Sequence, residues 1–196
     1  MCYVLSSAMP ISHHEPKPQV SEFLAMAAHE LLARYAISIE QFDRRVVQLK
    51  DDQLDMAFLP DAGVGRWPVR VLVGHLADAE LAFVFRMRLV VAEEHPVLTP
   101  WDENAFIDND LYGLTPGAPG AARLSIGGPI AAIHTLRKWT GEWLRSLEPS
   151  EWERKGLHPE RGEQTVRMIL AYDTWHLENH AWYLNAKVEK FLGKGE

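Results

Sequence analysis

Cysteine is nearly absent from the sequence, which contains only Cys2. A single cysteine cannot form an internal disulfide, which fits a reducing compartment, and it leaves no material for a cysteine-based metal site. Clusters of Lys and Arg are also missing, and the formal net charge is −7. The protein therefore offers little electrostatic attraction to the phosphate backbone of a nucleic acid. We therefore expect no nucleic-acid partner, and we look to His, Asp and Glu for chemistry.

Long apolar stretches are lacking too. Residues 1–18 have neither the basic start nor the sustained apolar run of a secretory signal, and no other run approaches the roughly 20 residues of a membrane span. We expect a soluble, cytoplasmic protein with no membrane partner. The 196 residues, 47% of them hydrophobic, suit one core. We predict a disordered or loosely packed lead-in over residues 1–20 and a single domain over residues 21–196.

Strand-like alternation is not convincing anywhere, whereas four stretches repeat apolar residues with helical spacing. They predict helices over about Ser21–Leu49, Pro68–Glu94, Pro129–Leu147 and Glu163–Leu192, and hence an all-α four-helix bundle. The connection over residues 95–128 is long enough to let the second and third helices lie parallel. Connections of this length tend to be lids or binding segments.

Two histidines of the fourth predicted helix, His176 and His180, are four residues apart. This spacing stacks them on one side of a helix, where both rings can converge on one metal ion. His75 lies in the middle of the apolar face of the second predicted helix. A structural role for each histidine, such as a hydrogen bond to a carbonyl or to Asp173, is the alternative.

One ion would relieve the desolvation of all three inward histidines, so we predict His75, His176 and His180 as its ligands. Asp78 and Asp173 each lie one turn from a ligand and are candidates to accept hydrogen bonds from the rings. Their alternative role is in salt bridges. Three imidazoles accept several first-row metals, and we expect zinc or nickel, with iron or manganese as alternatives.

Three protein ligands leave a coordination position open, as in catalytic rather than structural sites. A divalent metal there would activate water for hydrolysis, or bind a thiol as a thiolate for thiol transfer. The sequence does not distinguish hydrolysis from thiol transfer. Asp102 and His158 are the candidate catalytic groups, with a turn or capping role as the alternative for His158, and Glu178 is expected to be solvated.

Substrate contacts are predicted from Arg86, on the inward stripe of the second helix, and from Trp101 in the long connection. Arg86 would anchor an anionic small molecule. Its alternative is a pair with a buried carboxylate.

Several short segments carry a resemblance to a known family, in the expected order. They are Trp67-Pro68, Gly74-His75-Leu76-Ala77-Asp78-Ala79-Glu80, Trp101-Asp102-Glu103, His158-Pro159-Glu160-Arg161-Gly162 and Trp175-His176-Leu177-Glu178-Asn179-His180. The sequence resembles the DinB-like family, including its YfiT-type metal-dependent hydrolases and thiol S-transferases. The resemblance implies a four-helix bundle with an up-down-down-up course, often dimeric, with His75, His176 and His180 as metal ligands and a low-molecular-weight thiol as a possible partner.

Two other function classes stay open. The protein could be a metal-binding module without turnover, or an interaction scaffold. Met168, Trp175 and Trp182 recur every seven residues on the side of the fourth helix away from the histidines. Such a seam suits a homodimer surface, or it packs against the long connection.

Overall fold

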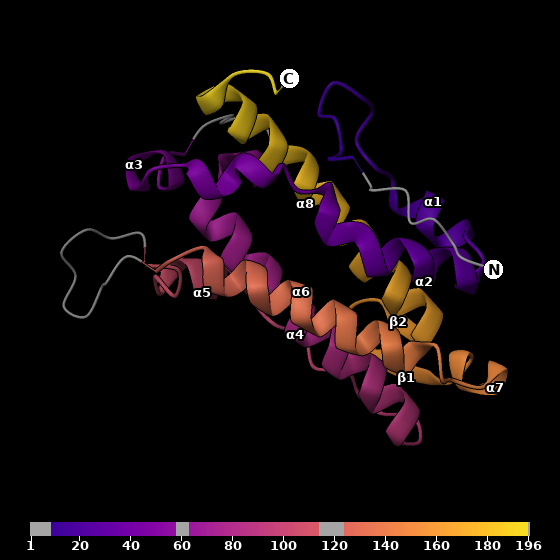
Figure 1. Ribbon diagram of the computed structural model, residues 1–196. Coiled ribbons are helices and arrows are strands. Elements are labelled where there is room, and N and C mark those ends of the chain that lie inside the picture. The colour runs from indigo at the N-terminus through magenta and orange to yellow at the C-terminus, as the bar shows by residue number, and fades with distance from the viewer. Residues whose placement is uncertain (1–8, 58–62, 114–123, 196) are drawn as a thin grey trace.

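The computed structural model describes residues 9–57, 63–113 and 124–195. Four helices make up the bundle: α2 (Ala28–Ile37), α4 (Val69–Ala92), α6 (Gly127–Leu144) and α8 (Val166–Leu192). Figure 1 shows α4 and α6 running in the same direction, with α2 and α8 running opposite to them. The four-helix bundle and its up-down-down-up course are therefore confirmed.

The first predicted helix is not continuous, and the single helix over Ser21–Leu49 was wrong. The structure has α1 (Val20–Ala25) and α2, followed by two 3₁₀ helices, η1 (Ser38–Gln41) and η2 (Arg44–Gln48). The chain is extended at Met26 and Ala27, where the side chain of Glu30 accepts a hydrogen bond from the Ala27 N–H at 3.1 Å. This local cap begins a new helix, although the apolar spacing continues across the break.

Short helical turns fill the connections: α3 (Asp51–Leu54), η3 (Gly63–Arg66), α5 (Glu103–Asp108) and α7 (Pro149–Trp152). The long connection between α4 and α6 contains α5. It brings the chain back to the starting end of α4 before α6 begins (Figure 1). This return lets α4 and α6 run parallel.

A two-stranded hairpin, which was not predicted from the sequence, precedes α8. Strands β1 (Lys155–His158) and β2 (Gly162–Thr165) pair antiparallel, and Gly162 has a φ of 73°, a left-handed conformation that glycine adopts without strain. The strands are too short to show a clear alternation. The Thr165 side chain accepts a hydrogen bond from the Met168 N–H, so α8 begins at Val166 rather than near Glu163.

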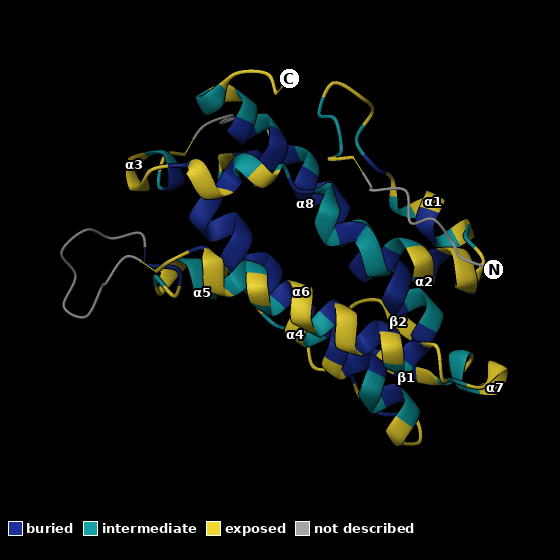
Figure 2. Ribbon diagram, viewed as in Figure 1, coloured by how far each residue is buried: buried dark blue, intermediate teal, exposed yellow. Residues whose placement is uncertain are grey.

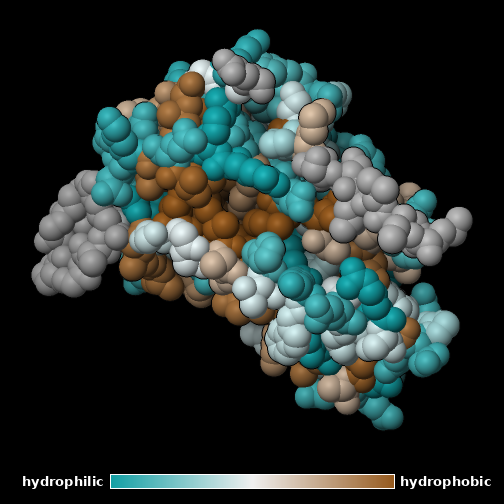
Figure 3. Space-filling model, viewed as in Figure 1, coloured by the Kyte–Doolittle hydropathy of each residue, from teal (hydrophilic) through white to brown (hydrophobic). Residues whose placement is uncertain are grey.

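The interior consists of two hydrophobic clusters along the bundle. Leu72, Leu76 and Leu177 belong to the first, and Ala79 and Phe83 belong to the second. Figure 2 shows the buried residues of α4 and α8 on the sides that face the interior. In Figure 3, hydrophobic residues gather between the upper and lower helices of the face drawn, with hydrophilic residues around them. Because Leu76 belongs to the first cluster and Ala79 to the second, His75 lies on α4 where the two clusters meet.

The lead-in contacts α8 from Ile11 onward, and residues 1–8 lie outside the described residues. The indole N–H of Trp175 donates to the Pro18 carbonyl, and that of Trp182 donates to the Glu15 carbonyl. The seam that we considered for dimerisation or for packing on the long connection thus contacts the lead-in. Homodimerisation stays a prediction. Within the described residues, every helix is too short or too polar to cross a membrane.

Candidate metal centre

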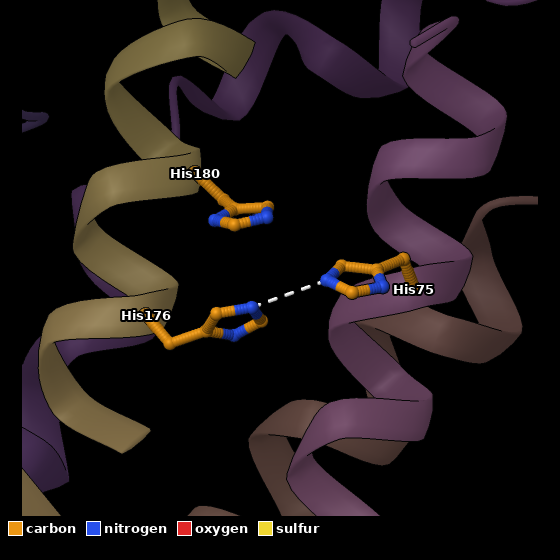
Figure 4. Close-up of side chains that lie close together, drawn as sticks. All are labelled: His75, His176 and His180. Atoms are coloured by element: carbon orange, nitrogen blue, oxygen red, sulfur yellow. Dashed lines mark hydrogen bonds between the residues drawn. The ribbon is translucent and has the colours of Figure 1, made fainter. Parts of the chain in front are cut away.

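Three histidines converge between α4 and α8. His75 comes from α4, while His176 and His180 come from successive turns of α8, and Figure 4 shows their rings directed toward one another. The Nε2 atoms of His75 and His176 are 3.1 Å apart. One nitrogen from each of the three residues lies within 4.8 Å of the others. Two nitrogens on one tetrahedral zinc, each about 2.0–2.1 Å from the metal, would be about 3.3 Å apart.

Burial keeps these rings neutral. It lowers the pKa of His75 to about 4 and that of His180 to about 3, and it holds the pKa of His176 well below its usual value. Neutral imidazole offers the lone pair that a metal requires. His75 Nδ1 and His180 Nε2 are buried without a hydrogen-bond partner in the described part of the chain. Buried polar atoms rarely stay unpaired, so the unpaired His180 Nε2 fits a ligand of a divalent cation, which His75 would reach with the Nε2 atom that faces His176.

A cavity of about 200 Å³ opens onto the three rings. Trp67, Phe83 and Trp101 form its apolar wall. The Trp101 ring stacks on His75 with centroids 5.3 Å apart, and the Trp67 ring meets His75 edge-on at 4.8 Å. These contacts fix the orientation of the His75 ring and reduce the access of water to it.

A sequence model of the DinB superfamily matches residues 34–184. The chain belongs to the DinB superfamily.

Bacterial DinB-superfamily relatives are named for metal-dependent hydrolysis. The chain is 31% identical over 141 residues to "Putative metal-dependent hydrolase OB0782" of Oceanobacillus iheyensis, an alignment that covers 72% of this chain and 74% of that protein. It is 28% identical over 173 residues to "Putative metal-dependent hydrolase YfiT" of Bacillus subtilis, with 87% and 88% covered. These names give the relatives' assigned class.

The solved structure of YfiT from Bacillus subtilis, described as having an unusual four-helix bundle topology, superposes on the chain with a TM-score of 0.64. The match covers 92% of this chain and 95% of that one, at 23% sequence identity. It shows that the two proteins share the fold.

The two carboxylates predicted to support this DinB-superfamily site have other partners. Asp78 accepts a hydrogen bond from the Tyr112 hydroxyl at 2.8 Å. Asp173 forms an ion pair with Arg137 at 2.6 Å, and Arg137 also pairs with Glu80 at 2.7 Å. Among the described residues, neither aspartate is hydrogen-bonded to a ring of the three histidines. The salt-bridge alternative therefore describes Asp173.

The two candidate catalytic residues, Asp102 and His158, lie in different surroundings. One Oδ of Asp102 accepts hydrogen bonds from the N–H groups of Asn104 and Ala105, which caps α5. His158 is 1% exposed, and its Nδ1 accepts from the Glu160 N–H. Asp102 thus has a capping role and His158 the predicted turn role, while a part in catalysis for either stays a prediction.

Glu178 corrects a prediction, because it is buried rather than solvated. It is 1% exposed, and both of its oxygens accept hydrogen bonds from Arg34 of α2, at 2.8 and 2.7 Å. This bidentate pair ties α2 to α8 on the side away from the cavity.

A second group of potential ligands lies at the surface, where His13 and His14 meet Glu189. His14 Nε2 is 3.2 Å from a Glu189 oxygen, and its side chain is 56% exposed. Since that contact already satisfies the ring nitrogen, the surface group lacks the unpaired buried atoms of the DinB-superfamily site.

Arg86 and Trp101, which were predicted to contact the substrate, line the cavity, and contact with a substrate stays a prediction. Trp67, Glu103 and Arg161 also line the cavity. Each of the three belongs to a segment that carried the family resemblance. They lie in connecting segments, where no helical periodicity indicates the direction of a side chain, so they were not predicted as cavity residues.

Proposed function

We propose that this protein is a metal-dependent hydrolase of small molecules, with one divalent ion, zinc or nickel, held by His75, His176 and His180. The observation that carries the proposal is the convergence of three neutral, buried imidazoles, two with unpaired nitrogens, at the floor of a cavity. The names of the DinB-superfamily relatives support the same class of reaction.

The chain's own residues prepare the site for this chemistry. A divalent cation, when bound, supplies a Lewis acid that makes a bound water or thiol more acidic near neutral pH. Trp67 and Trp101 hold the His75 ring and restrict the entry of water. Glu103 is the carboxylate that lines the cavity, and in our proposal it accepts a proton from the attacking group. This assignment replaces Asp102, whose carboxylate caps α5.

The proposal is tested with metal-restored protein offered small esters, small amides, and pairs of a thiol with an electrophile. We expect hydrolysis that disappears on chelation and in the variant His176→Ala. The control is His134→Ala, an exposed histidine of α6. Turnover of only the thiol pairs would replace hydrolysis by thiol transfer, and inactivity of fully loaded protein on every substrate would identify a binding module.

A further inference from the structure

Two arginines line the same cavity as the three histidines. Arg86 belongs to α4 and is 4% exposed, while Arg161 lies in the turn of the β1–β2 hairpin. Within the described part of the chain, neither guanidinium forms an ion pair with a carboxylate. An arginine buried without a counter-ion loses hydration that nothing in the protein replaces.

Arg86 is held in place by a neutral group. Its Nε and Nη2 donate to the Thr99 carbonyl at 3.2 and 2.7 Å, whereas Nη1 has no hydrogen-bond partner among the described residues. Burial lowers the pKa of Arg86, and the nearby charge of Arg161 lowers it further. The two positive charges therefore lie close enough to repel each other.

Arg161 reaches the cavity from the other side. Its guanidinium carbon lies 5.4 Å from the centre of the Tyr172 ring, and Tyr172 is on α8 one turn before His176. This contact with an aromatic face favours a position of Arg161 beside the histidines.

The two nearby carboxylates do not neutralise the two arginines. Glu160 attracts Arg86 without pairing with it, and Glu103 lines the cavity without an ion pair to either arginine. The Thr99 carbonyl and the Tyr172 ring account for the positions of the two arginines, but neither of these neutral groups balances the two positive charges at the cavity.

We infer that Arg86 and Arg161 together bind a carboxylate group of the substrate beside the three-histidine site. The inference rests on the proposed function and names its substrate class: small organic acids whose ester, amide or comparable bond lies a few atoms from a free carboxylate. Guanidinium groups present paired N–H donors that match the two oxygens of a carboxylate. The cavity of about 200 Å³ has room for a small organic acid.

The test measures binding rather than turnover. Calorimetric titration of the full chain compares butyrate with butyramide, which has nearly the same shape and no charge. We expect butyrate to bind at least about tenfold more tightly, and we expect Arg161→Gln and Arg86→Gln each to remove about tenfold of that preference. Arg161 is exposed, so Arg161→Gln keeps the fold even if Arg86→Gln loosens the loop at Thr99.

The matched control is Arg145→Gln, an exposed arginine at the end of α6, which should keep the full preference. Repeating the titration on chelated protein separates the arginines from direct coordination of the carboxylate by the metal. Equal binding of both probes, an unchanged preference in Arg161→Gln, or tighter binding of methyl phosphate than of butyrate would overturn the inference. A butyrate preference that persists in chelated protein supports the arginine site. If metal-loaded protein turns over none of the substrates while the butyrate preference is intact, the proposed function fails and this site stands.

Discussion

The Nε2 atoms of His75 and His176 lie 3.1 Å apart although 101 positions separate the two residues in the chain. A hydrogen bond between two neutral rings uses the N–H of one and the lone pair of the other, so it cannot also satisfy His180. His180 Nε2 remains without a partner in the described part of the chain. A cation that accepts a lone pair from each ring engages one nitrogen of all three at once, and the second nitrogen of each ring then carries an N–H.

Metal removal should therefore lower the thermal stability. Saturating a native-state site at about a thousand times its Kd adds about 4 kcal/mol, which corresponds to roughly 10 °C for a domain of this size. We expect zinc or nickel added to chelated protein to raise Tm by that order in the wild type and in His14→Ala, but not in His176→Ala. Differential scanning calorimetry with elemental analysis measures both quantities. A shift that survives in His176→Ala and disappears in His14→Ala would place the ion at the surface group.

Glu103 and Asp102 are adjacent and should behave differently when each carboxylate is replaced by an amide. Glu103→Gln should lower kcat by about a hundredfold or more with little change in Tm, because general-base assistance contributes about that factor. Asp102→Asn keeps a side-chain oxygen that can cap α5, so it should change kcat only slightly. Steady-state kinetics on the best ester of the panel decides between them. A larger loss in Asp102→Asn would return the role to Asp102.

The sequence was sufficient to predict the three-histidine convergence because helical spacing reports direction. His75 lies in the apolar stripe of α4 and His176 and His180 lie four apart on α8, so the bundle brings them together. The same reasoning predicted the four bundle helices and the long connection between α4 and α6. The ends of α4, α6 and α8 differ from the prediction by a few residues, as expected where caps decide the boundary, whereas α2 is much shorter than the first predicted helix.

The sequence did not reveal which charged residues pair with one another. Glu178 pairs with Arg34, which is 144 positions away, and Asp173 pairs with Arg137, 36 positions away. A helical wheel gives the direction of a side chain but not the identity of the group it meets on another helix. The hairpin was missed because strands of four residues give too little alternation to detect, and the break before α2 depends on one local cap.

Gly74 lies directly before His75, and its lack of a side chain admits the Tyr112 ring. A Cβ at position 74 would lie 2.4 Å from a ring carbon of Tyr112, which is 6% exposed and donates to Asp78. Gly74→Ala should therefore destabilise the protein by about 1–3 kcal/mol. The matched control is Gly128→Ala in α6, where a Cβ meets nothing within 4 Å and alanine should stabilise by about 0.5–1 kcal/mol. Urea unfolding measures both, and equal effects would contradict the close packing of Tyr112.

Lys187 predicts a dependence of stability on pH. It is 0% exposed, its ammonium donates to the Gly65 carbonyl, and burial lowers its pKa from 10.5 to about 8. Below pH 8 the lysine is protonated in both the folded and the unfolded chain, so the cost of burying the charge is fully present. Between pH 8 and 10.5 the unfolded chain holds more protons than the folded one, so stability rises with pH.

The variant Lys187→Met isolates this contribution, since every other titrating group is shared with the wild type. We expect the free energy of unfolding of the wild type, relative to the variant, to increase by about 2 kcal/mol from pH 7 to pH 10. Urea denaturation at several pH values measures the difference. A constant difference across that range would mean that Lys187 stays protonated in the folded state, held by a local interaction strong enough to offset its burial.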